Sequence, residues 1–164
     1  MSENDLGSKI SVAPFEGGCA CGAVRYVSQA DPIFMANCHC RDCQKASGSA
    51  YAPIVVTDRS SVTITGDLIG HMTISAGGNE VTRSSCAKCG SLLFGWVEKN
   101  PGFIVIVASS LDDPEWFQPA FNLWTNSKPG WSYLDPALPT FEGQPPESNP
   151  IYDGYRRDEA GHAA

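Results

Sequence analysis

The chain is organised around one stretch, Asn37-Cys38-His39-Cys40-Arg41-Asp42-Cys43-Gln44-Lys45-Ala46-Ser47-Gly48, in which three of its seven cysteines lie within six positions. If the segment ending at Cys40 is extended, Cys38 and Cys40 project from the same face, because strand side chains repeat every second residue. Cys43 then falls in the first turn of a short helix, where free N–H groups and the helix dipole favour a thiolate. Three thiolates can thus converge on one point and leave a fourth direction open, the arrangement that reactive zinc sites use.

The other four cysteines form two short knuckles, Cys19-Ala20-Cys21-Gly22 and Cys86-Ala87-Lys88-Cys89-Gly90, each closed by a glycine. A knuckle folds tightly so that backbone N–H groups point at sulfur, and glycine permits the positive φ that this often requires. Two paired knuckles far apart in sequence are a common way to build a closed four-thiolate zinc site. This partition into four and three uses every cysteine and predicts two zinc sites per chain.

Two other interpretations of the cysteines stay open. One is a disulfide framework, but seven is an odd number, and a bridge between cysteines as close as Cys19 and Cys21 would be strained. The N-terminal residues do not resemble a signal peptide, so we expect a cytoplasmic protein, and in that reducing compartment clustered cysteines favour metal. The second interpretation makes His39 a fourth ligand of a closed structural site, although strand alternation directs it away from its cysteine neighbours.

Length and charge limit the classes of function. A chain of 164 residues is expected to form one domain. We place it at residues 12–144, between a flexible N-terminus at 1–11 and a mobile C-terminal tail at 145–164. The net charge of −7 and the pI of about 4.8 argue against binding to nucleic acid or to anionic membranes, which needs a positive field. No apolar run is long enough to cross a membrane.

The pattern along the chain predicts a mainly β fold of short antiparallel strands with one or two short helices. The 16 glycines and 12 prolines suit short strands joined by turns better than long helices. A short helix is predicted at 42–47, ending at Gly48, and one helical turn at 112–117. Strands are predicted at 23–27, 33–40, 51–57, 62–65, 68–74, 80–85, 92–97, 103–108 and 120–125.

Three motifs together resemble one known family. They are Gly17-Gly18-Cys19-Ala20-Cys21-Gly22-Ala23-Val24-Arg25-Tyr26, then Cys38-His39-Cys40-Arg41-Asp42-Cys43-Gln44-Lys45, then Cys86-Ala87-Lys88-Cys89-Gly90. In this order and spacing the chain resembles the glutathione-dependent formaldehyde-activating enzyme family, which includes the centromere protein V homologues, over residues 15–141. The resemblance implies a β-rich, tent-like zinc fold. It also implies a structural zinc on Cys19, Cys21, Cys86 and Cys89 and a catalytic zinc on Cys38, Cys40 and Cys43.

The chain departs from the family pattern at two positions. Ser85 stands where many members have an aromatic residue before the second knuckle, and Asn122 stands where many have a histidine near the last strand. Neither position is a predicted zinc ligand, but both can alter the pocket.

The resemblance implies a carbon–sulfur lyase of the S-(hydroxymethyl)glutathione synthase type. Its small-molecule partners would be a thiol such as glutathione, activated by zinc, and formaldehyde or another small aldehyde. Glutathione carries two carboxylates, so Arg41 and Lys45 beside the ligands are the predicted substrate-binding residues, with Arg25 and Arg83 behind them.

A non-catalytic zinc-stabilised protein-interaction module is the alternative function. Among the other side chains of interest, His39 and His71 can relay protons, and the four tryptophans, Trp96, Trp116, Trp124 and Trp131, are expected mainly in the core or as cover, with one possible in the pocket wall.

Overall fold

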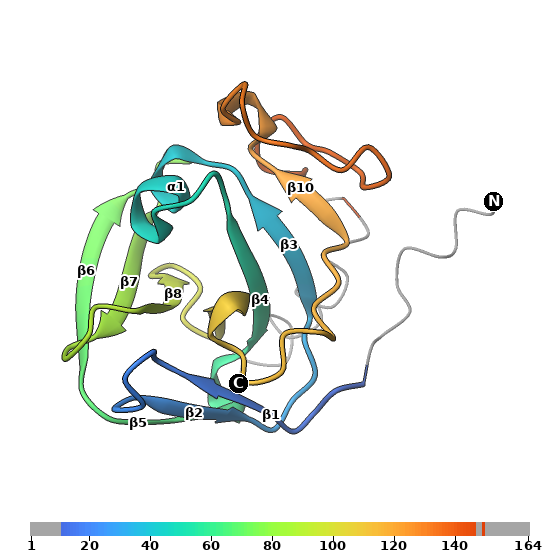
Figure 1. Ribbon diagram of the computed structural model, residues 1–164. Coiled ribbons are helices and arrows are strands. Elements are labelled where there is room, and N and C mark those ends of the chain that lie inside the picture. The colour runs from blue at the N-terminus through green and yellow to red at the C-terminus, as the bar shows by residue number, and fades with distance from the viewer. Residues whose placement is uncertain (1–10, 147–148, 150–164) are drawn as a thin grey trace.

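The computed structural model describes residues 11–146 and 149 and confirms a mainly β fold (Figure 1). The predicted flexible N-terminus at 1–11 and mobile tail at 145–164 lie almost wholly outside the described residues. The strands are β1 (Phe15–Gly18), β2 (Arg25–Ser28), β3 (Phe34–Cys38), β4 (Ala52–Asp58), β5 (Val62–Thr65), β6 (Leu68–Ile74), β7 (Glu80–Cys86), β8 (Leu92–Val97), β9 (Phe103–Val107) and β10 (Phe121–Leu123). The helical elements are α1 (Arg41–Ser47) and the 3-10 turns η1 (Arg59–Ser61), η2 (Ala108–Ser110) and η3 (Thr125–Ser127).

These strands form two sheets. A three-stranded antiparallel sheet has the order β1-β2-β5, and a seven-stranded sheet has the order β10-β3-β4-β9-β8-β7-β6. Figure 1 shows the small sheet across one end of the large one, with α1 at the opposite end. None of the helical segments in the described ranges has the length and hydrophobicity needed to span a bilayer.

Two local predictions differ from the structure. Strand β10 pairs with β3 in parallel, not antiparallel, because the chain crosses over from β9 before it enters the sheet edge beside β3. The expected helical turn at 112–117 is a single hydrogen-bonded turn, in which the Phe117 N–H donates to the Pro114 carbonyl. The Asp113 carboxylate accepts from the Glu115 N–H, and this local side-chain bond competes with helix formation.

The central strands of the large sheet present one face to the main core and the other to a pocket. In the paired strands β4 and β9, Val55 and Ile106 are opposite each other and fully buried in the main core. Their neighbours Val56 and Val105 are also paired and line the pocket on the other face. The sequence of β9, Phe-Ile-Val-Ile-Val, has no polar residue in alternation for this reason, since both faces of the strand are apolar and covered.

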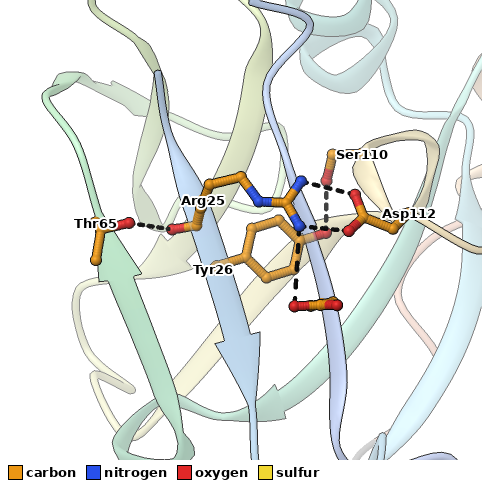
Figure 2. A network of polar contacts seen from close by, with 6 residues as sticks. Arg25, Tyr26, Thr65, Ser110 and Asp112 are labelled. Atoms are coloured by element: carbon orange, nitrogen blue, oxygen red, sulfur yellow. Dashed lines mark hydrogen bonds and ion pairs between the residues drawn. The ribbon is translucent and has the colours of Figure 1, made fainter. Parts of the chain in front are cut away.

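A polar network ties the small sheet to the segment that follows η2 (Figure 2). The Arg25 guanidinium donates to both carboxylate oxygens of Asp112, with the Nη1–Oδ1 distance 2.8 Å, and Glu16 lies 3.9 Å away. The hydroxyls of Tyr26 and Ser110 are 2.8 Å apart. Arg25 therefore forms an ion pair on the small sheet and does not line the pocket that contains Cys38.

We expect Gly66→Ala to destabilise the fold much more than Gly78→Ala. Both glycines turn the chain with positive φ, +95° at Gly66 and +76° at Gly78. A Cβ at Gly78 would meet no atom within 4 Å. Gly78→Ala should therefore lower the free energy of unfolding only through the left-handed backbone, by about 1 kcal/mol. A Cβ at Gly66 would collide with the carbonyl oxygen of Ala23, so its cost is at least about 2 kcal/mol. Urea unfolding of the two variants measures the difference, and equal losses would contradict this packing.

Candidate metal centres

The two knuckles meet at the junction of the two sheets. Cys19 and Cys21 lie between β1 and β2, whereas Cys86 ends β7 and Cys89 follows it. The four sulfur atoms all lie within 4.8 Å of one another. The Sγ atoms of Cys19 and Cys21 are 3.5 Å apart, and those of Cys21 and Cys86 are 3.9 Å apart. These distances exclude disulfide bonds in this cluster, and all seven cysteines are free thiols.

Backbone N–H groups point at the knuckle sulfurs, as the sequence predicts. The Val24 N–H donates to Cys19 Sγ at 3.2 Å, and the Lys88 N–H donates to Cys86 Sγ at 3.4 Å. Hydrogen bonds from the Ser91 hydroxyl and backbone lower the pKa of Cys89 to about 5, so this sulfur is readily ionised. Four converging sulfurs with such support can hold a metal ion, and tetrahedral zinc matches the donor set.

The second cluster forms where β3 passes into α1. Cys38 ends β3, Cys40 is the N-cap of α1, and Cys43 lies in its first turn. Their three sulfurs lie within 4.8 Å of one another, and the Cys43 N–H donates to Cys40 Sγ at 3.3 Å. Cys38 and Cys40 are buried and Cys43 is half-buried. We call this group the three-cysteine site.

The charges of the three-cysteine site fit a cation. Hydrogen bonds from Cys38 and Cys43 lower the pKa of Cys40 far below its usual value. The same contacts, together with burial, raise the pKa of Cys38. These opposite directions arise because adjacent thiolates repel each other, so one sulfur ionises more readily than its neighbour. A divalent ion would remove this conflict and let all three sulfurs ionise, which is what a zinc ligand set requires.

His39 does not join this site. Its ring is buried on the other side of the chain, with Nε2 3.4 Å from Asn122 Oδ1 and the ring centroid 5.1 Å from that of Tyr51. The backbone N–H of His39 donates to the Leu123 carbonyl of β10. Among the described residues no histidine, aspartate or glutamate clusters with the three sulfurs. The interpretation of His39 as a fourth ligand is not supported by this arrangement.

The helix α1 is short and is held by contacts from distant segments. The Gln44 side-chain amide donates to the carbonyls of His39, at 2.6 Å, and Ser127, at 3.0 Å. The Asp42 carboxylate accepts from the Ala76 N–H at 3.1 Å, which attaches the β6–β7 loop to the helix. Sequence reasoning missed Gln44 and Asp42 in these roles, since nothing local identifies their partners.

A pocket of about 500 Å³ opens beside the three-cysteine site. Cys38, Cys40 and Cys43 all line this pocket. The rest of the lining includes alternate residues of β3, β4, β7 and β9, and residues of the loop between β6 and β7. The charged side chains in the described lining are Arg83 and Lys99. Arg41 and Lys45, the predicted substrate-binding residues, are exposed on α1 and are not part of that lining. The sequence gives no signal for Lys99, because its position depends on how the strands pair.

Two tryptophans contribute to the pocket wall, Trp96 and Trp124. Trp124 has φ 56° and ψ 38°, a left-handed conformation that is rare for a bulky side chain. Its ring lies beside the β6–β7 loop, since a Cβ added at Gly77 would be 3.6 Å from it. The other two tryptophans lie elsewhere, Trp116 packed on Phe15 and Trp131 exposed. His71 is exposed on β6 and does not line the pocket.

Comparison with known proteins agrees with the cysteine motifs. The family model described as glutathione-dependent formaldehyde-activating enzyme matches residues 14–127. The chain belongs to this family. A Halomonas elongata protein that carries the family's name is 29% identical over 141 residues, covering 81% of this chain and 90% of its own. A crystal structure of a Rhodobacter sphaeroides protein is similar at 18% identity, with a TM-score of 0.48, and covers 59% of this chain and 87% of its own.

The two departures from the family pattern lie outside the pocket lining. Ser85 is at the bulge of β7, where the pairing with β8 shifts register. Asn122 is buried in β10, where its Oδ1 accepts from Asn37 Nδ2 at 3.2 Å and faces His39. Asn122 therefore lies in the strand that pairs with β3 and contacts the residues on either side of Cys38.

We expect Cys40→Ser to remove one metal ion and leave the fold intact. A wild-type chain loaded with zinc should hold about two ions, and the variant about one. The three-cysteine site joins segments that β3, β4 and β10 already hold together, so its loss should change the circular dichroism little.

The matched variant Cys89→Ser should disrupt the fold, because its cluster joins the small sheet to β7. Elemental analysis and circular dichroism on both variants test this difference. An unfolded Cys40→Ser with a folded Cys89→Ser would reverse the two assignments.

Proposed function

We propose that this protein is a zinc-dependent carbon–sulfur lyase-type enzyme. It would add a thiol, glutathione or a similar one, to formaldehyde or another small aldehyde, forming an S-hydroxymethyl or related adduct, and would catalyse the reverse cleavage. The observation that carries the proposal is the three-cysteine site itself, in which three sulfurs converge at the wall of a pocket without a fourth protein ligand among the described residues. Membership of the formaldehyde-activating family supports the same chemistry.

Each cysteine cluster has its own role in this proposal. Cys19, Cys21, Cys86 and Cys89 would hold a structural zinc that joins the sheets. Cys38, Cys40 and Cys43 would hold a catalytic zinc, which would lower the pKa of an incoming thiol and supply it as a nucleophilic thiolate.

The chain's own residues would bring the two reactants together. Apolar side chains of β4 and β9 line the pocket and would contact the aldehyde. The thiol sulfur attacks the carbonyl carbon, a carbon–sulfur bond forms, and the carbonyl π pair moves to oxygen, which takes up the proton that the thiol lost. No aspartate or glutamate is in the described lining, so this proton would pass through solvent.

The carboxylates of glutathione need cationic partners. Arg41 and Lys45 remain the partners predicted from sequence, and both are exposed on α1, where Arg41 donates to Gln44 Oε1. Arg83 and Lys99 are further candidates because they line the pocket.

An interaction module is the second candidate function. Strand β6 is an edge of the large sheet, and Ile69, Met72 and Ile74 on it are exposed. Exposed apolar side chains on an edge strand are typical of surfaces that bind another chain. In this case the three-cysteine site would carry zinc for stability only.

Cobalt substitution separates these functions. We expect the ligand-field spectrum of the cobalt-loaded protein to change when millimolar glutathione or a small thiol is added, because an open coordination position accepts the thiol sulfur. The Cys40→Ser variant keeps only the four-cysteine cluster, so its spectrum should not respond. A wild-type spectrum that stays constant with every thiol would remove the main support for catalysis and favour the interaction module.

A further inference from the structure

Along one row of paired residues in the large sheet, the side chains beside the pocket change from apolar to cationic. Strand register places Val56 of β4 opposite Val105 of β9, Val105 opposite Gly95 of β8, and Gly95 opposite Arg83 of β7. Paired residues share a face, so the row runs from apolar side chains, across a residue with no side chain, to a cation. Ile54, two residues from Val56 on the same face, extends the apolar part toward the three-cysteine site. We call Ile54, Val56 and Val105 the floor of the pocket.

Gly95 leaves a gap in the middle of this row. A Cβ added there would lie 4.0 Å from Val105 Cβ, 4.0 Å from Arg83 Cγ and 3.6 Å from the Thr82 carbonyl oxygen. These are ordinary van der Waals distances, so a Cβ fits at this position without a clash. The side chain of that residue would stand between the apolar floor and the guanidinium.

The cationic side of the pocket is formed by Arg83 and Lys99. Arg83 donates through Nη1 to Thr73 Oγ1 at 3.0 Å, which fixes the guanidinium against β6. Arg83 and the three cysteines line the same pocket. Arg83 and Lys99 line the pocket without an acidic residue in the described lining, although the chain as a whole has a net charge of −7. This local reversal of sign favours an anionic ligand.

We infer that the pocket accepts an adduct with two unlike ends, a carboxylate on the thiol that contacts Arg83 and Lys99, and an alkyl or aryl group on the aldehyde carbon that lies on Ile54, Val56 and Val105. This rests on the proposed function and narrows its substrate class to apolar aldehydes. The adduct carbon of formaldehyde bears two hydrogens and no alkyl or aryl group, so it would leave the floor uncovered. The chemistry is unchanged: the thiol sulfur bonds to the carbonyl carbon, and the carbonyl oxygen gains the thiol proton.

Binding of stable thioethers tests the inference without requiring catalysis. S-methyl, S-propyl and S-hexyl glutathione have the same carboxylates and differ only in the apolar group. With the zinc-loaded full chain, we expect affinity to rise about fourfold for each methylene that reaches the floor. Tryptophan fluorescence is a suitable readout, because Trp96 and Trp124 line the pocket. Equal affinities across the series would overturn the inference.

Two glycine variants locate the apolar subsite. Gly95→Leu should abolish the dependence on chain length, since its side chain would occupy the floor. Gly70→Leu on β6 is the matched control, because an added Cβ there also makes only ordinary contacts, at 3.5 Å, and Gly70 pairs with Ser84, on the face of the sheet opposite Arg83. In Gly70→Leu the affinity should rise with chain length as it does in the wild type. Equal metal content and melting temperature would show that both variants fold. If the affinity of folded Gly95→Leu still rose with chain length as in the wild type, the assigned floor would be wrong.

The carboxylate subsite is tested by comparing two arginines. Arg83→Met should weaken all three thioethers about tenfold or more, because a charge-assisted hydrogen bond is lost from each. If Arg41→Met weakens them more than Arg83→Met does, the carboxylate is held on α1 and the assignment to Arg83 is wrong.

Turnover then separates this inference from the proposed function. Relative to the uncatalysed reactions, hexanal should be a better substrate than formaldehyde with glutathione. Catalysis with formaldehyde but no chain-length effect would overturn the inference and keep the proposed function. A chain-length effect that Gly95→Leu abolishes would support the pocket assignment, and the absence of any turnover would then count against the proposed function alone.

Discussion

The convergence of sulfur atoms is the constraint on which this structure depends. The four-cysteine cluster joins a knuckle in the small sheet to one that follows β7, and the two are 65 residues apart between Cys21 and Cys86. The strands have three to seven residues, so any single strand contributes little to the stability of the fold. A metal held at this junction would couple the two sheets, because the ion binds only when both knuckles are in place.

The three-cysteine site has a different relation to the fold. Strand β3 carries Cys38 and is held on both sides, by β4 and by the parallel strand β10. The helix that carries Cys43 is fixed by Gln44 to Ser127 and by Asp42 to the β6–β7 loop. The geometry of these cysteines is therefore set by hydrogen bonds that exist without a metal. This suits the catalytic role proposed for the site, in which a bound ion would keep one position open.

Sequence reasoning succeeded where the determinants are local. The cysteine spacings, the glycines beside them and the alternation along the strands depend on a few neighbouring residues, and the resulting clusters and strands agree with the structure. Features that depend on register could not be predicted in this way. Arg41 is adjacent to Cys40 in sequence, yet α1 directs it to solvent, whereas Arg83 reaches the pocket from a strand about 40 residues further on. The parallel pairing of β10 follows from a crossover that no single-sequence pattern specifies.

Side chains along the central strands alternate between the core, where they stabilise the fold, and the pocket, where they would contact a ligand. On β4, Val55 packs in the main core while Ile54 and Val56 face the pocket, and on β9 Ile106 and Val105 divide in the same way. A substitution on the pocket face thus changes the ligand's surroundings and leaves the core contacts in place, because the two sets point in opposite directions. A sheet with one face in the core and the other beside a reactive site can vary its substrate while keeping its fold. The cysteine motifs identify the family, whereas in the proposed function the strand faces would determine which adduct the pocket accepts.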